Sequence, residues 1–232
     1  MKKRKTALVL VMTVLIVCGS FCLLRGYDAQ EDALWALEQG ETGKHKTAFI
    51  PDEIKAGFIF YPGGLVDHAA YAPLMKELAN KGVLCLLLEM PFDLAVLDAD
   101  AADGLTALYP EVRRWMIGGH SLGGAMAADY AAKHPEEFLG LVLLGAYSAV
   151  DLSGTDLHVL SIFGSEDGVL RYEKYEQSLG NYPEDFKEVV INGGNHAQFG
   201  SYGVQKGDGI AKISAEEQRK QTVDAIVHLL NR

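Results

Sequence analysis

Cysteine is scarce in this sequence of 232 residues, which holds three. Cys18 and Cys22 lie in an apolar N-terminal segment, and Cys85 lies in a run that is typical of a buried strand, so no disulfide framework is expected within the domain. Cys85 is interpreted as a small core residue rather than a catalytic thiol. Clusters of His, Cys, Asp and Glu at ligand spacing are lacking as well, and neither a metal nor another cofactor is predicted.

Basic residues are few, with 21 Lys and Arg against 31 Asp and Glu. The first 26 residues hold five of the basic residues and no acidic one, which leaves 16 basic against 31 acidic residues, a net charge of −15, for the rest of the chain. A surface of that sign argues against nucleic-acid binding and against lying flat on anionic lipid.

Charged residues are absent from 7–24, a stretch that follows the basic cluster Lys2 to Lys5. Its 18 residues would span about 27 Å as a helix, close to the thickness of a hydrocarbon core. The segment favours an uncleaved anchor whose basic end stays in the cytoplasm, with the domain on the outer side of the cytoplasmic membrane. A cleaved signal peptide is the alternative, although no Ala-x-Ala site follows the apolar run. In both cases the domain is exported.

The rest of the chain alternates between apolar runs and helical periodicity. Strands are predicted at 47–50, 56–61, 83–88, 114–117, 139–144, 159–163 and 188–191. Helices are predicted at 28–39, 69–80, 99–108, 172–179 and 215–230. A further helix is predicted over the alanines at 125–132, and His134-Pro135 should end it. This alternation is typical of an α/β domain with a doubly wound, mostly parallel sheet. We expect an anchor or signal segment at 1–26, a connector at 27–46 and one domain at 47–232.

A Gly-x-Ser-x-Gly motif lies between the strand at 114–117 and the Ala-rich helix that follows it. A serine on a sharp strand-to-helix turn has a strained backbone, and side chains two positions away would collide with neighbouring backbone. Gly119 and Gly123 remove those side chains. The motif therefore indicates that Ser121 is a nucleophile.

A nucleophilic serine needs a base, and in open-sheet hydrolases the base lies on a loop at the carboxyl end of a strand. His196 meets this requirement because it lies in a glycine-rich turn after the strand at 188–191. His158 lies at the entry of a strand, and His228 lies on a surface-like face of the last helix. We predict that His196 is the base.

The base needs a carboxylate that fixes its tautomer and stabilises the imidazolium. Asp167 is the predicted acid because it follows the strand at 159–163. Glu166 lies at the same end of that strand, and Asp151 follows the preceding strand, so both remain alternatives.

An oxyanion requires two backbone N–H donors, one from the residue after the nucleophile and one from the loop after an earlier strand. Leu122 is predicted to supply the first, and Gly64 or Leu65 the second. His120 is interpreted as a packing or hydrogen-bonding residue, because an elbow turns the neighbouring side chain away from the nucleophile. Asp67-His68 either lines the pocket or caps the following helix.

On these motifs the chain resembles a compact bacterial member of the α/β-hydrolase fold family, close to its lidless dienelactone-hydrolase-like branch. The resemblance covers about 47–230 and rests on the turns that carry Ser121, Asp167 and His196 and on the Gly63-Gly64 loop. It departs from the family at Pro62, where a His often precedes the oxyanion glycine, and at Ser121, where dienelactone hydrolases carry Cys. About 14 residues separate the strands at 139–144 and 159–163, too few for a helical lid, which indicates an open site.

The resemblance implies a serine hydrolase that cleaves small, soluble esters or thioesters through an acyl-enzyme, outside the cytoplasmic membrane. Membrane contact is expected through the N-terminal segment only. The alternative is a catalytically silent binding domain of the cell envelope, because lyases, haloperoxidases and inactive binding proteins share this scaffold.

Overall fold

The computed structural model describes residues 26–230, and an eight-stranded sheet lies at its centre. The sheet order is β1-β2-β4-β3-β5-β6-β7-β8. The strands are β1 (Glu41–Gly43), β2 (Lys46–Phe49), β3 (Ala56–Tyr61), β4 (Val83–Leu88), β5 (Trp115–His120), β6 (Gly140–Leu144), β7 (His158–Gly164) and β8 (Phe186–Ile191). β3 to β8 run parallel to one another, whereas β2 pairs antiparallel with both β1 and β4. The predicted mostly parallel sheet is confirmed.

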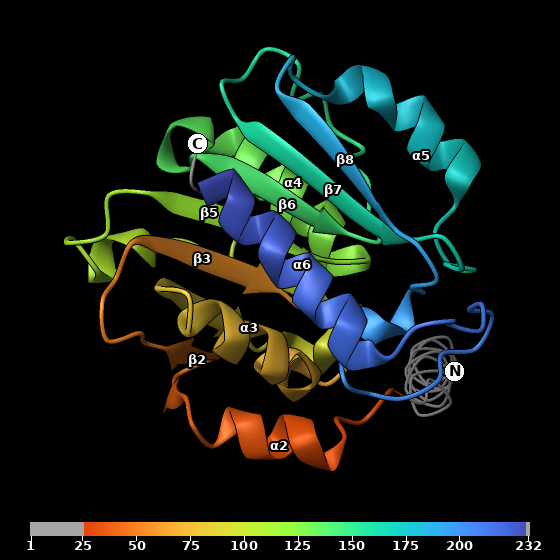
Figure 1. The fold of residues 1–232 in the computed structure, drawn as a ribbon. Helices are drawn as coiled ribbons and strands as arrows, with labels where there is room; N and C mark the ends of the chain where they lie inside the picture. Colours follow the sequence, from red (N-terminus) through yellow and green to blue (C-terminus); the bar gives the residue numbers. More distant parts are fainter. Residues whose placement is uncertain (1–25, 231–232) are drawn as a thin grey trace, which may run out of the picture.

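Helices cover both faces of this sheet. α3 (Ala72–Ala79) and α6 (Ala215–Leu230) pack on the front face in Figure 1, and α4 (Leu122–Lys133) packs on the back face. Every residue of β3, β4, β5 and β6 is buried, as expected for parallel strands that are covered on both sides. The alanines of α4 let it lie close to the sheet, and α6 has the predicted bounds.

The remaining elements lie at the edges of the sheet and in its loops. They are α2 (Glu31–Leu37), α5 (Tyr172–Ser178) and the 3₁₀ helices η1 (His68–Tyr71), η2 (Pro91–Asp93), η3 (Ala95–Leu97), η4 (Thr106–Leu108), η5 (Pro135–Glu137), η6 (Leu179–Asn181) and η7 (Ala197–Phe199). The predicted connector packs on the domain, because Lys76 lies over the Trp35 ring and β1 extends the sheet.

The helix predicted at 99–108 is absent, and that prediction is wrong. Turns and the short η4 occupy the segment. The Tyr61 hydroxyl donates to the carbonyl of Ala99 and accepts from the N–H of Ala102, so a side chain from β3 binds backbone groups that a helix would pair internally. Gly104, with a φ of +69°, then turns the chain.

β5 extends three residues beyond its predicted end and reaches His120. Gly118 and Gly119 remain in the strand because β3 and β6 pair with them on either side. Ser121, the predicted nucleophile, therefore follows the strand directly.

The predicted membrane segment lies outside the described residues, apart from Gly26. Within 26–230, none of the helices has the length and apolar character needed to cross a bilayer.

Candidate active site

Ser121 lies in the turn between β5 and α4, at the carboxyl edge of the sheet. Its φ of 52° and ψ of −121° are strained for a residue with a side chain, and its N–H donates to the carbonyl of Leu144 at 2.9 Å. A Cβ at Gly119 would overlap the carbonyl oxygen of Tyr61, and one at Gly123 would overlap that of Pro62. The two glycines are therefore needed for the close approach of α4 to the loop after β3, which is the steric role predicted for them.

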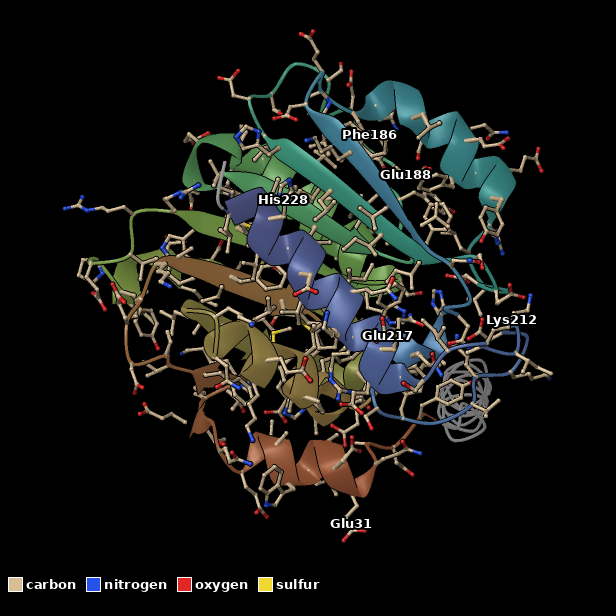
Figure 2. All side chains as sticks on the ribbon, viewed as in Figure 1. Glu31, Phe186, Glu188, Lys212, Glu217 and His228 are labelled. Carbon is tan, nitrogen blue, oxygen red and sulfur yellow. The ribbon has the colours of Figure 1, made fainter. Side chains whose placement is uncertain are left out.

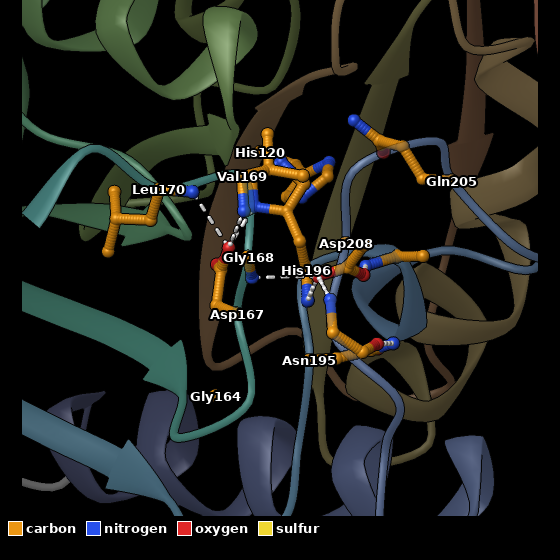
Figure 3. Close-up of polar contacts among 12 residues, drawn as sticks. His120, Gly164, Asp167, Gly168, Val169, Leu170, Asn195, His196, Gln205 and Asp208 are labelled. Carbon is orange, nitrogen blue, oxygen red and sulfur yellow. Dashed lines mark hydrogen bonds and ion pairs between the residues drawn. The ribbon is translucent and has the colours of Figure 1, made fainter.

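His196 and Asp167 come together from the loops after β8 and β7 (Figure 3). The Nδ1 atom of His196 lies 2.8 Å from Oδ2 of Asp167, and both side chains are buried. Oδ1 of Asp167 accepts from the N–H groups of Val169 and Leu170, which fixes the carboxylate and leaves Oδ2 for the imidazole. Because Nδ1 then carries the proton in the neutral ring, Nε2 is available as a base.

Ser121 and His196 line the same cavity, which has a volume of about 480 Å³. Nε2 of His196 is buried and has no hydrogen-bond partner among residues 26–230. Hydrogen bonds between a base and its nucleophile often tighten only when substrate is bound. The other walls come from 145–149 and 169–171, where Arg171 supplies a basic side chain. The loop at 199–213 contributes no residue to this lining.

A larger cavity of about 580 Å³ lies at the opposite edge of the sheet, near Lys55 and Lys81. It is lined by the residues before β3 and β4 and contains no serine, cysteine or histidine. It therefore lacks the groups needed for nucleophilic catalysis.

The structure distinguishes the two residues considered for the second oxyanion donor. The N–H of Leu65 donates to the carbonyl of Asp93 at 2.7 Å and is not available. The N–H groups of Gly64 and Leu122 have no partner in the part of the chain that the structure describes. A Cβ on Gly64 would press against the Leu122 side chain, so these two residues are neighbours. The structure thus leaves Gly64 and Leu122 as candidate donors.

The two alternative acids lie away from the histidine. Glu166 pairs with Lys212 at 2.8 Å, and Asp151 is exposed and accepts from Ser153. Asp67 accepts from the N–H of Ala69, so of its two proposed roles it has the capping one.

The two rejected histidines also lie elsewhere. His158 begins β7 and pairs with Asp185. His228 is exposed on α6, beside the strand that carries Phe186 and Glu188 (Figure 2).

The side chain of His120 lies against His196, although the elbow turns it away from Ser121. Its ring lies 4.4 Å from that of His196, centroid to centroid. The N–H of Gly63 donates to the hydroxyl of Tyr71, and that hydroxyl lies 2.8 Å from Nδ1 of His120. His120 is thus a packing and hydrogen-bonding residue that lies between the Gly63-Gly64 loop and His196.

His120 should make the stability of the protein depend on pH. Burial, followed by the neighbouring His196, lowers the pKa of His120 well below its ordinary value. The unfolded chain therefore binds this proton more readily, and the free energy of unfolding should fall as the pH decreases below about 6.5, by up to about 1.4 kcal/mol per pH unit. In His120→Gln, the side-chain amide can still form a hydrogen bond with Tyr71 but does not titrate. Urea unfolding of both proteins across this pH range should give a shallower pH dependence for the variant. Equal slopes would contradict the prediction.

Known proteins share this fold and part of this sequence. A crystal structure of a predicted CIB-like hydrolase from Thermoplasma acidophilum has a TM-score of 0.59 at 16% identity, covering 81% of this chain and 92% of that one. Est1E from Butyrivibrio proteoclasticus has a TM-score of 0.61 at 14% identity, covering 81% of this chain and 94% of that one. At these identities the likeness shows the fold alone.

Sequence comparison supplies the family. A protein of Mycobacterium phage D29 named "Putative non-heme haloperoxidase" is 27% identical over 121 residues, and the match spans 44% of this chain and 44% of that protein's length. The sequence pattern of the alpha/beta hydrolase family matches residues 57–220, a range that contains Ser121, Asp167 and His196. This chain therefore belongs to the alpha/beta hydrolase family.

Proposed function

We propose that this protein is a serine hydrolase that cleaves carboxylic esters or thioesters through an acyl-enzyme on Ser121. The observation that carries the proposal is the buried 2.8 Å hydrogen bond between His196 and Asp167, beside a strained Ser121 that lines the same cavity. An isolated buried carboxylate is costly, and a carboxylate that orients an imidazole next to a serine is the arrangement that activates the hydroxyl.

In the acylation step, Oγ of Ser121 attacks the carbonyl carbon while Nε2 of His196 accepts the hydroxyl proton. Asp167 stabilises the imidazolium that forms. The negative charge on the substrate oxygen is stabilised by the N–H groups of Leu122 and Gly64. When the tetrahedral intermediate collapses, His196 returns the proton to the leaving alcohol or thiol, and the acyl group remains on Ser121.

Deacylation repeats these steps with water as the nucleophile. His196 takes a proton from the water, the water oxygen attacks the acyl carbonyl, and the proton returns to Oγ of Ser121 as the acid leaves. The same two N–H groups stabilise the second oxyanion, so one site serves both half-reactions.

The proposed substrates are small, soluble acyl esters or thioesters, as in the dienelactone-hydrolase-like branch. The segment at 145–157 contains no helix that could form a lid, and the cavity beside Ser121 is of a size suited to a small acyl group. We place the domain on the outer side of the cytoplasmic membrane, held by an N-terminal anchor at 1–26 or released if that segment is a cleaved signal peptide.

A fluorophosphonate probe tests the activity directly. Folded wild-type protein should be labelled on Ser121, and Ser121→Ala should not be labelled, because the probe reacts with an activated serine hydroxyl. Ser153→Ala is a matched control, since Ser153 is exposed and, among the described residues, its side chain forms a hydrogen bond only with Asp151. A folded wild-type protein that is not labelled would favour the alternative, a catalytically silent envelope binding domain.

A further inference from the structure

Asp208 accepts hydrogen bonds from both loops that carry the histidine and its acid (Figure 3). Its Oδ1 accepts from the N–H of His196 at 3.2 Å and from that of Gly168 at 3.0 Å. Its Oδ2 accepts from the N–H of Ala197 at 2.8 Å. Gly168 follows Asp167 directly, so one carboxylate connects the acid turn to the histidine turn.

The backbone around His196 depends on side chains for its hydrogen bonds. The N–H of Asn195 donates to Gln218, and the N–H of Gln198 donates to the side chain of Asn195. The two N–H groups between them, those of His196 and Ala197, donate to Asp208. Because a buried N–H without an acceptor is unfavourable, removal of this carboxylate should allow the turn to move.

The loop that carries Asp208 approaches the acid turn closely. A Cβ on Gly209 would overlap the carbonyl oxygen of Glu166, and a Cβ on Gly168 would lie 2.6 Å from the carbonyl oxygen of Gly207. The N–H of Gly209 also donates to Oδ1 of Asp208 at 2.8 Å. Glycines on both sides thus allow the carboxylate of Asp208 to reach the two turns.

We propose that Asp208 is a positioning residue that sets the geometry of the His196–Asp167 pair. The inference rests on the proposed function, in which His196 is the base. Asp208 does not line the cavity, so it acts through the two turns and not through the substrate.

The test compares Asp208→Asn and Asp208→Ala with the wild-type full-length protein on a small soluble ester. Asn keeps one acceptor oxygen and Ala keeps none, so kcat should fall in the order wild type, Asn, Ala, with a loss of about 100-fold for Ala. KM should change by less than about twofold in both variants, because the cavity is intact. The matched control is Asp156→Asn, at an exposed acid for which the described residues supply no hydrogen bond.

A second measurement does not require turnover. The proton between His196 Nδ1 and Asp167 should give a far-downfield resonance in the wild-type protein, and Asp208→Ala should broaden or shift it. Loss of kcat together with a changed resonance supports positioning. Unchanged kcat, or an unchanged resonance at a temperature where the variant is folded, overturns it. A wild-type protein that shows the resonance but is neither active nor labelled would overturn the proposed function alone.

Discussion

Ser121→Ala and His196→Ala are each expected to lower kcat by about 10⁶-fold, and the double variant should be no worse than the more severe single one. The reason is that the hydroxyl and the imidazole perform one step together, so removal of either group leaves the other without a role. Residual hydrolysis should come from the oxyanion donors and substrate binding, which are retained in all three variants.

The measurement is kcat on a small soluble ester, made with full-length protein. Ser153→Ala and His228→Ala serve as controls, because both side chains are exposed and lie outside the cavity. Losses that multiply in the double variant would show that the two residues act separately. Retained activity in Ser121→Ala would remove it as the nucleophile.

Asp167→Asn is expected to lower kcat by about 10⁴-fold while the protein stays folded. The N–H groups of Val169 and Leu170 require an acceptor, so the amide oxygen should replace Oδ1 and place the NH₂ group against His196. Nδ1 would then have to accept a hydrogen bond, which moves the ring proton to Nε2. In that tautomer the imidazole cannot accept the proton of Ser121.

Glu166→Gln and Asp151→Asn are the matched controls for this prediction. Glu166 pairs with Lys212, and Asp151 accepts from Ser153, so neither carboxylate contacts the imidazole of His196. Both variants should retain activity within about twofold of the wild type, since neither carboxylate contacts His196 and the loss of an exposed polar pair costs little stability. Full activity in Asp167→Asn with a large loss in Asp151→Asn would move the acid to Asp151.

Much of the fold was predictable because its signals are local. The apolar runs of β3 and β4 have their predicted bounds, and Gly119 and Gly123 remove the side chains that would clash at the turn that carries Ser121. The chain order of serine, acid and histidine also indicated which loops to compare, since the carboxyl ends of parallel strands share one edge. The alpha/beta hydrolase family is confirmed, and the roles of the three side chains stay predictions.

Other features depend on contacts between residues far apart in the chain. Tyr61 binds the backbone of Ala99, 38 positions away. This contact prevents helix formation at 99–108, although the composition of that segment favours a helix. The N–H of Leu65 is occupied only because the loop after β4 brings Asp93 beside it. The sequence periodicity around Ala99 or Leu65 does not indicate which distant residue forms the hydrogen bond.

The amino-acid sequence by itself determined the alternation of strands and helices, the elbow and the order of the candidate catalytic residues, because period, glycine placement and motif spacing act within a few residues. Only the tertiary structure decided that the N–H of Leu65 is paired within 26–230 while that of Gly64 is not, that His120 lies against His196, and that Asp208 joins Gly168, 40 positions away, to the histidine turn. The physical reason is that a hydrogen bond or ring contact depends on distance in space. The order of the strands in the sheet sets that distance.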